Sequence, residues 1–163
     1  DVYKRQCLYR ASRNDAVSLR GDGAPAPQQR KDGMSADLFG LARSAMRKAH
    51  APYSRFPVGA ALRTTDGRIF AGCNVEAVSF PEGWCAETSA IAHMVMDGGG
   101  RIDEIAIVAE RLRACTPCGG CRQRIAEFGA PDTRVYLCDP VEGVVETLLM
   151  EDLFPRGFSA DAL

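Results

Sequence analysis

Three cysteines lie within seven residues of the sequence, in the segment CTPCGGC at 115–121. Cys118 and Cys121 follow a proline and precede a helical pattern, so we expect them at a helix N-terminus, where backbone amides and the helix dipole stabilise thiolates. Cys85 opens a second helical segment, CAETSA, with Glu87 two residues later. Three thiolates from two helix starts can hold one Zn²⁺ and leave its fourth tetrahedral position to water, which is the arrangement of a catalytic zinc site.

Glu87 favours a catalytic zinc site over two alternatives, a closed structural zinc site and a metal-free redox pair. The chain reads C-A-E at 85–87 and P-C-G-G-C at 117–121, an all-cysteine form of the zinc deaminase signature, in which the Glu is the general acid and base. If Cys115 were a fourth ligand, the zinc site would be closed and structural, and Glu87 would have no explanation. A metal-free C-x-x-C redox pair lacks the strand-then-helix context that thioredoxin-like motifs have.

The composition is that of a globular protein, with 46% hydrophobic and 25% charged residues. A net charge of −1 provides no basic surface for a nucleic acid. No apolar run approaches the roughly 20 residues that span a bilayer, so we expect no membrane partner. Seven cysteines form an odd set in a chain long enough to fold without disulfides, which indicates a reducing, cytoplasmic location. Cys73 and Cys138 lie in apolar strand patterns and are expected in the core.

The first 33 residues differ from the rest. They carry seven Lys or Arg against four Asp and include the Gly/Pro/Gln-rich stretch RGDGAPAPQQRKDG, which has no apolar period. We expect residues 1–33 to be disordered and not native to the domain, because a transposon-end adapter would encode DVYKRQ. A genuine disordered basic arm is the alternative. The catalytic domain is expected over residues 34–163.

Within 34–163, hydrophobic periodicity predicts three helices and five strands. The first helix is expected to be capped by Ser35, to end before Pro52 and to bury the apolar positions Leu38, Leu41, Ala45, Met46 and Ala49. The second, 85–96, should bury Ile91, Met94 and Val95 and end at the glycines 98–100. The third spans 119–129, and the strands are 58–64, 68–75, 105–109, 134–138 and 144–149. This order predicts an α/β fold, a three-layer α/β/α sandwich with a mixed sheet.

The domain resembles the small homotetrameric cytidine deaminases of pyrimidine salvage. The resemblance rests on APYSRFPVGAAL (51–62), GRIFAGCNVE (67–76), CAETSAI (85–91), PCGGCRQRIAEF (117–128) and LFPRGF (153–158). It implies a five-stranded mixed sheet, one Zn²⁺ per subunit and a homotetramer with shared active sites. It also implies hydrolytic deamination of cytidine and deoxycytidine to uridine and deoxyuridine, with release of ammonia.

The resemblance also implies roles for substrate-binding residues. Asn74 and Glu76 match residues that hydrogen-bond the ribose 3′-hydroxyl, and an amide and a carboxylate on one face of a strand end suit that task. A solvated strand face is the alternative. Phe56 matches an aromatic that packs on the pyrimidine, with plain core packing as the alternative. Phe80 and Phe158 match positions that reach into a neighbouring subunit's site, although core or loop packing would also explain them.

The backbone around Ala86 and Cys118 is expected to form hydrogen bonds with the edge of the base.

Two residues depart from the family pattern. Thr88 stands where many members have an Arg that offsets the thiolate charge, so we expect a hydrogen bond from Thr88 and help from Arg122 together with the helix N-termini. Ala77 replaces an Asn found in many members, so we expect one subunit contact or sugar contact to be looser. Both departures put rate and substrate tuning in doubt, and not the reaction class.

Three other functions compete with cytidine deamination. The substrate could be another cytosine-containing small molecule, such as a nucleoside antibiotic, although Asn74 with Glu76 favours a plain sugar. If Thr88 in place of the Arg has abolished activity, the chain would be a catalytically inactive, zinc-stabilised interaction module. Polynucleotide editing is disfavoured by the acidic balance of 34–163, with 13 basic and 17 acidic residues.

Overall fold

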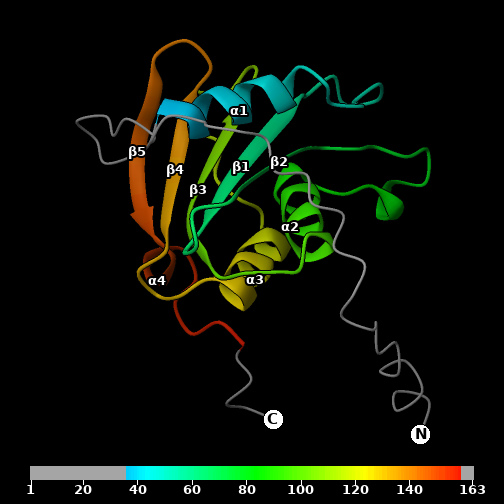
Figure 1. Ribbon diagram of the computed structural model, residues 1–163. Coiled ribbons are helices and arrows are strands. Elements are labelled where there is room, and N and C mark those ends of the chain that lie inside the picture. Colours follow the sequence, from blue (N-terminus) through cyan, green and yellow to red (C-terminus); the bar gives the residue numbers. More distant parts are fainter. Residues whose placement is uncertain (1–35, 159–163) are drawn as a thin grey trace, which may run out of the picture.

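A five-stranded mixed sheet forms the centre of the computed structural model, which describes residues 36–158 (Figure 1). The strand order is β2-β1-β3-β4-β5. Strands β3 and β4 are parallel, whereas the other neighbouring pairs are antiparallel. The strands are β1 (Val58–Thr64), β2 (Ile69–Cys73), β3 (Ile102–Ala109), β4 (Arg134–Asp139) and β5 (Gly143–Leu149). The predicted mixed sheet is therefore confirmed, with the 144–149 strand at one edge.

Helices cover both faces of the sheet. Helix α1 (Ala36–Met46) lies on one face, and α2 (Ala86–Met96) and α3 (Gly119–Phe128) lie on the other (Figure 1). A 3₁₀ turn, η2 (Phe80–Glu82), precedes α2, and a short helix, α4 (Met150–Leu153), follows β5. The three predicted layers are thus present. The tail 1–33 and the Ser35 cap lie outside the described residues.

Strand alternation divides the interior into two apolar clusters. On β3, Ile105 and Ile107 pack under α2 and α3, whereas Ala106 and Val108 face α1. Successive side chains of a strand point to opposite faces, so an unbroken apolar run is what a strand covered on both sides requires. The run IAIVA was predicted as a buried strand for this reason.

Three helix-face predictions and one core prediction were wrong. Helix α1 ends at Met46, so Ala49 lies beyond it and is only half-buried. Leu41 is 41% exposed, and Ala42 takes its place against the sheet. Val95 is 48% exposed, whereas Ile91 and Met94 are buried as expected. Cys138 lies in the core under α1, but Cys73 is only half-buried.

A glycine in β2 allows α2 to approach the sheet closely. A Cβ at Gly72 would overlap the backbone nitrogen of Ala90 and the side chain of Ser89. The hydroxyl of Ser89 also donates to the carbonyl of Cys73 at 2.7 Å. These contacts fix the helix that carries Cys85 and Glu87 at its first turn.

Within residues 36–158, no helix combines the length and apolar character needed to cross a membrane.

Candidate active site

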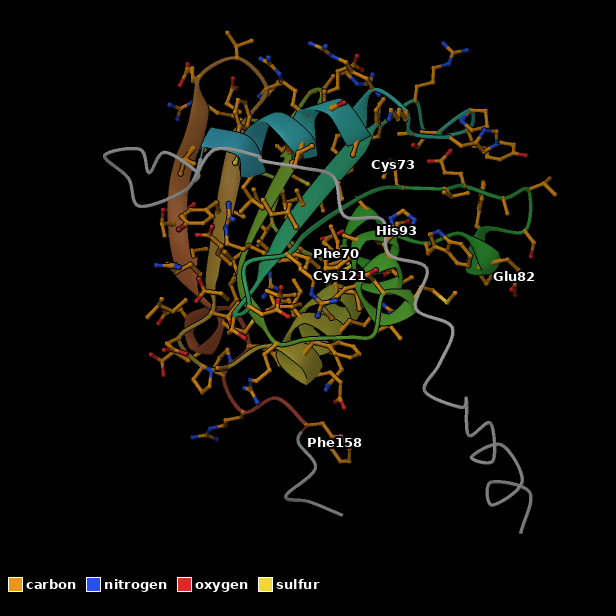
Figure 2. All side chains as sticks on the ribbon, viewed as in Figure 1. Phe70, Cys73, Glu82, His93, Cys121 and Phe158 are labelled. Atoms are coloured by element: carbon orange, nitrogen blue, oxygen red, sulfur yellow. The ribbon has the colours of Figure 1, made fainter. Side chains whose placement is uncertain are left out.

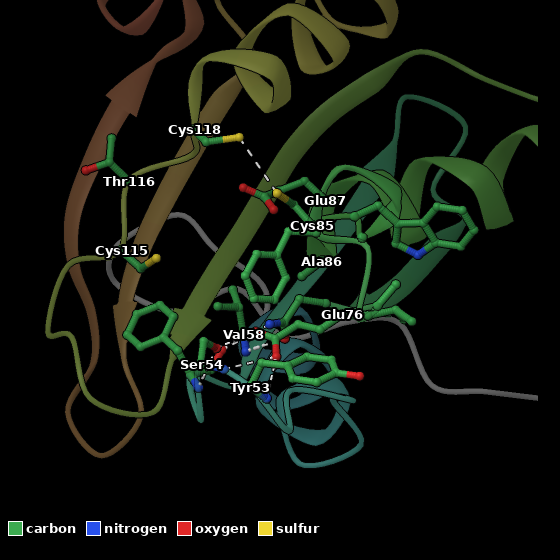
Figure 3. Close-up of a pocket in the computed structure, with 17 residues that line it drawn as sticks. Tyr53, Ser54, Val58, Glu76, Cys85, Ala86, Glu87, Cys115, Thr116 and Cys118 are labelled. Carbon is green, nitrogen blue, oxygen red and sulfur yellow. Dashed lines mark hydrogen bonds between the residues drawn. The ribbon is translucent and has the colours of Figure 1, made fainter.

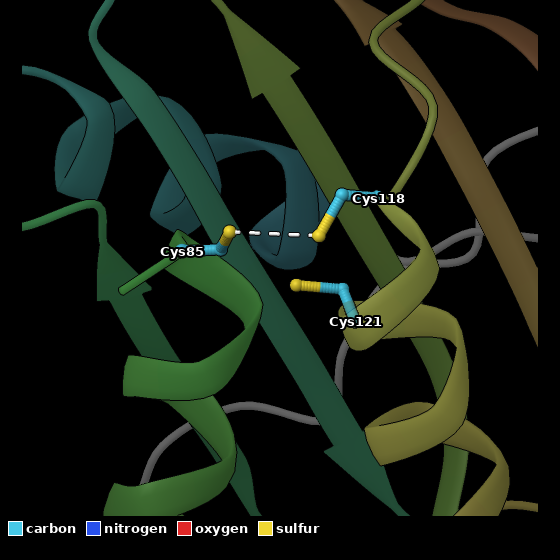
Figure 4. A group of neighbouring side chains, drawn as sticks. All are labelled: Cys85, Cys118 and Cys121. Atoms are coloured by element: carbon cyan, nitrogen blue, oxygen red, sulfur yellow. Dashed lines mark hydrogen bonds between the residues drawn. The ribbon is translucent and has the colours of Figure 1, made fainter. Parts of the chain in front are cut away.

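The sulfurs of Cys85, Cys118 and Cys121 lie within 4.8 Å of one another (Figure 4). Cys85 is the N-cap of α2 and Cys118 is the N-cap of α3, both with extended backbone, and Cys121 follows in the first turn of α3. The two helix N-termini therefore meet at one point, as the sequence pattern predicted. Their free amides and dipoles favour negative charge there.

Hydrogen bonds between the three thiols change the pKa values of Cys85 and Cys121. The Sγ atoms of Cys85 and Cys118 are 3.7 Å apart. Hydrogen bonds from the Cys121 and Cys118 thiols lower the pKa of Cys85 to about 6, aided by the positive charge of Arg124. The hydrogen bond with Cys85, together with burial, raises the pKa of Cys121. The cluster therefore already supports one thiolate near neutral pH.

This donor set fits zinc. The three sulfurs are soft ligands that suit Zn²⁺, and Cys85 already favours the thiolate form. Three protein ligands would leave the fourth position of a tetrahedral ion open. Cys115 is not a member of the cluster. Its thiol lines the neighbouring cavity, and burial raises its pKa to about 11, which keeps it protonated (Figure 3). The arrangement is that of an open site and not of a closed four-cysteine site.

Glu87 lies in the first turn of α2 beside the sulfur of Cys85 (Figure 3). Only 4% of the residue is exposed. Burial raises the pKa of its carboxyl, and the negative charge on Cys85 adds to this effect. A raised pKa makes this carboxyl easier to protonate, and a general acid and base must both accept and return a proton.

A cavity of about 700 Å³ opens in front of Glu87 and two of the sulfurs (Figure 3). Its volume lies within the range of small-molecule sites, and most of its lining is apolar or aromatic. Among the predicted site residues, the lining includes Phe56, Asn74, Glu76, Phe80, Cys85, Ala86, Glu87 and Cys118. Phe158 does not line this cavity. It is 64% exposed and lies at the end of the described chain beyond α4 (Figure 2).

Asn74 and Glu76 make contacts that the sequence did not predict. The Asn74 side chain accepts from the Val58 amide at 2.8 Å and donates to the Phe56 carbonyl at 3.0 Å. The Glu76 carboxylate accepts from the amides of Tyr53 and Ser54 at 3.0 and 3.1 Å. Both residues therefore hold the loop between α1 and β1 as well as facing the cavity.

Ser54 is a residue of the cavity that the sequence analysis missed. Its hydroxyl donates to Glu76 and accepts from the Phe56 amide at 3.0 Å. The hydrogen bond from Ser54 is the main cause of a lowered pKa for Glu76. The signal for Ser54 was present in the segment APYSRF, because serine commonly bonds to nearby amides in turns, but its carboxylate partner is 22 residues away.

The expectations for Thr88 and Arg122 were wrong, whereas the expectation for Ala77, which lines the cavity, stays a prediction. The Thr88 hydroxyl is buried with no hydrogen-bond partner within 36–158, and it lines a second cavity of about 500 Å³ between α1 and α2. The Arg122 guanidinium donates to the carbonyls of Pro117 and Leu153, both at 2.9 Å. Arg122 thus holds the loop before Cys118, and the positive charge of Arg124 contributes to the lowered pKa of Cys85.

Comparison with known proteins supports the same interpretation. Residues 34–138 match the family model described as the cytidine and deoxycytidylate deaminase zinc-binding region. A cytidine deaminase of Sporosarcina psychrophila is 40% identical over 126 residues, which cover 77% of this chain and 92% of the relative. One from Halalkalibacterium halodurans is 39% identical over 76% of this chain and 93% of the relative.

Solved structures agree with these relatives. The crystal structure of cytidine deaminase from Burkholderia pseudomallei is 41% identical, with a TM-score of 0.70 over 75% of this chain and 97% of that one. A Mycobacterium tuberculosis cytidine deaminase structure is 37% identical, with a TM-score of 0.67 over 76% of this chain and 95% of that one. With this fold, the three convergent sulfurs and a matched region that contains them, the chain belongs to the cytidine and deoxycytidylate deaminase family.

Proposed function

We propose that this chain catalyses zinc-dependent hydrolytic deamination of cytidine and deoxycytidine to uridine and deoxyuridine, releasing ammonia for pyrimidine salvage. The observation that carries the proposal is a buried carboxyl, Glu87, beside three convergent sulfurs at one end of a cavity large enough for a nucleoside. Membership of the family and the names of its relatives support this reaction.

In the proposed mechanism, Cys85, Cys118 and Cys121 would hold Zn²⁺, and the ion when bound would make a water molecule acidic enough to lose a proton near neutral pH. Glu87 takes that proton and delivers it to N3 of cytosine. The water oxygen then bonds to C4. Glu87 carries the second proton from this oxygen to the 4-amino group, the C4–N bond breaks, and ammonia leaves.

The remaining residues would orient the nucleoside. The first amide of α2, at Ala86, and the backbone at Cys118 read the base edge. Phe56, half-buried at the cavity wall, packs on the pyrimidine. Asn74 and Glu76 bind the 3′-hydroxyl with the hydrogen-bonding capacity that their loop contacts leave. An amide has two donor hydrogens and two acceptor lone pairs, so one loop contact of each kind does not exhaust it.

A homotetramer with shared active sites fits the exposed aromatic residues around the cavity. Phe80 is 72% exposed and packs edge-on against Tyr53, with ring centroids 5.8 Å apart. Trp84 is also exposed and lines both this cavity and the second one. Burial of such residues by a neighbouring subunit would remove apolar surface from water. Phe158, which is absent from its own chain's cavity, would reach a neighbour's.

The partner expected from this proposal is a small nucleoside, with no nucleic acid or membrane. Free thiols at Cys85, Cys115, Cys118 and Cys121 fit a reducing cytoplasm. We further propose that the catalytic unit spans 34–163. The family match begins at residue 34, so deletion of 1–33 is expected to leave melting temperature and activity unchanged. A large loss of either would contradict this boundary.

Ammonia release from cytidine by zinc-loaded protein tests the proposed function directly. Deoxycytidine and a cytosine-containing nucleoside antibiotic form the rest of the substrate panel, and metal analysis gives the zinc content. We expect turnover of both nucleosides and about one zinc per chain. Turnover of the antibiotic alone would favour the alternative substrate. Folded, zinc-loaded protein that releases no ammonia would favour the interaction module.

A further inference from the structure

An arginine outside every motif of the family resemblance holds one wall of the cavity. Arg111 lies in the connection between β3 and α3, the same connection that carries Cys115, Thr116 and Cys118 along the cavity. Its guanidinium donates from Nη2 to the carbonyl oxygens of Ser54, at 3.4 Å, and of Arg55. These carbonyls belong to the loop between α1 and β1, which supplies Tyr53, Ser54 and Phe56 to the lining of the same cavity.

The loop that receives Arg111 has an unfavourable backbone conformation. Arg55 has a φ of +52°, in the left-handed region that non-glycine residues rarely occupy. Such a residue persists where surrounding contacts hold it. The Arg55 amide donates to the Ala51 carbonyl at 3.0 Å, and Arg111 binds the Arg55 carbonyl.

Opposite charges hold the two sides of this turn. The Glu76 carboxylate accepts from the amides of Tyr53 and Ser54, whereas the Arg111 guanidinium binds the carbonyls of Ser54 and Arg55. The negative carboxylate therefore contacts peptide N–H groups, and the positive guanidinium contacts peptide carbonyl oxygens, so both contacts are favourable. The next residue, Phe56, is attached through its amide to the Ser54 hydroxyl, so the turn sets where its ring lies.

We propose that Arg111 is a positioning residue that fixes the nucleoside-facing loop 53–56 against the connection that carries the zinc ligands. Arg111 is not among the residues that line the cavity, so it acts on substrate binding through Phe56 and Glu76. The proposal rests on the proposed function, because it names the residue that shapes that site for a nucleoside.

The variant Arg111→Ala tests it. Because Arg111 is exposed, we expect the variant to fold, with zinc content unchanged. The KM for cytidine is expected to rise about tenfold while kcat stays within about twofold, the pattern of lost ground-state binding. Arg111→Lys, which keeps a donor, should recover part of the KM. Arg55→Gly in the Arg111→Ala background should also recover part, because glycine adopts positive φ without strain.

Arg113→Ala is the matched control. Arg113 lies two residues along the same connection, is exposed, and pairs with Glu142 at 2.8 Å instead of with the loop. Its removal is expected to leave the KM unchanged. An equal rise of the KM in both variants would show a general charge effect and would overturn the proposal.

Tryptic cleavage after Arg55 gives a readout that needs no substrate. A loop released by Arg111→Ala should be cut between Arg55 and Phe56 faster than in the parent protein or in Arg113→Ala, measured as the peptide that ends at Arg55. If the parent protein fails to deaminate cytidine, the proposed function fails and cleavage still decides whether Arg111 holds the loop. Unchanged cleavage, or faster cleavage with an unchanged KM for cytidine, would overturn the role of Arg111.

Discussion

Among residues 36–158, the carboxylate side chains of Glu87 and Glu104 are buried, and their surroundings differ. Glu104 accepts from Arg63 at 2.9 Å and from the Tyr136 hydroxyl at 3.0 Å, so it is part of a hydrogen-bonded structural cluster on the sheet. Glu87 is buried beside sulfurs, and burial raises its pKa. A raised pKa makes a carboxyl easier to protonate, which suits the proton carrier proposed for this site.

Glu87→Gln is therefore expected to keep the fold and the zinc while losing activity. The amide is nearly the same size but cannot carry a proton, so the rate of cytidine deamination should fall by at least ~10³-fold. Ammonia release measures the rate, and metal analysis of the same sample measures the zinc. Activity close to that of the parent protein would remove Glu87 from the mechanism.

Cys115 and Cys121 are expected to respond differently to substitution. Cys115→Ala should retain zinc and most activity, because its thiol lies outside the sulfur cluster. Cys121→Ala should lose zinc, because a buried ligand disappears. Zinc content after dialysis against a mild chelator measures both. Zinc loss in Cys115→Ala would indicate a closed site with four sulfurs.

The sulfur cluster could be predicted from sequence because each half of it is a local motif: Cys118 and Cys121 are three residues apart, and Cys85 and Glu87 share one helical turn. The two halves are 33 residues apart, and only the order of the two motifs, which matches the zinc deaminase signature, connected them. Ser54 and Arg111 could not be predicted in the same way. Their partners lie 22 to 57 residues away, across loops whose path depends on the whole fold. Asn74 and Glu76 were singled out, but their contacts with the loop became visible only in the structure.

At the scale of elements, two glycines set how closely the helices approach the sheet. A Cβ at Gly72 would overlap α2, and a Cβ at Gly59 in β1 would overlap Ala42 and Met46 of α1. Either alanine substitution should therefore destabilise the fold, by about 1–3 kcal/mol. Only Gly72→Ala displaces the helix that carries Cys85 and Glu87.

We expect Gly72→Ala to lower zinc retention and activity beyond its effect on stability, and Gly59→Ala to lower stability alone. Chemical denaturation of each variant gives the free energy of unfolding, and ammonia release at a temperature where both are folded gives activity. Equal losses of activity in the two variants would show that the position of α2 has no special effect on the site.

The errors in the helix faces have a physical cause. In α1, both the predicted set and the observed set of buried residues follow helical spacing, and the larger Leu41 favoured the wrong one. The close approach at Gly59 places the small Ala42 against the sheet, and Leu41 instead lines the second cavity. In α2, apolar residues occur all round the helix, so periodicity alone could not decide the exposure of Val95.

The turn between β1 and β2 carries a pH-dependent contribution to stability. Hydrogen bonds from Arg68 and Thr64 lower the pKa of Asp66 from 3.8 to about 2. A carboxyl whose pKa is depressed by folding stabilises the fold above its unfolded pKa, and this contribution is lost as the pH falls through the folded value. The melting temperature of Asp66→Asn should therefore be below that of the parent protein at pH 6, with the difference shrinking between about pH 4 and pH 2. A constant difference across that range would contradict this assignment.

For the whole molecule, we expect a particle of four 17.6 kDa chains in solution. Phe80→Ala should weaken the assembly or the activity, because Phe80 is an exposed aromatic at the mouth of the cavity. Val141→Ala is the control, since Val141 is equally apolar and exposed but lies in the turn between β4 and β5. Light scattering gives the mass. A monomeric parent protein with full activity would rule out shared active sites.

The meeting of two helix starts at the three sulfurs also affects the folding equilibrium. Cys85 and Cys118 are 33 positions apart, so an ion held by both cross-links distant parts of the chain in the folded state only. Any ligand that prefers the folded form shifts the equilibrium by mass action, by about 2.7 kcal/mol at a hundredfold excess over its Kd. The melting temperature of this protein is thus expected to rise with the free zinc concentration, and a chelator is expected to lower it.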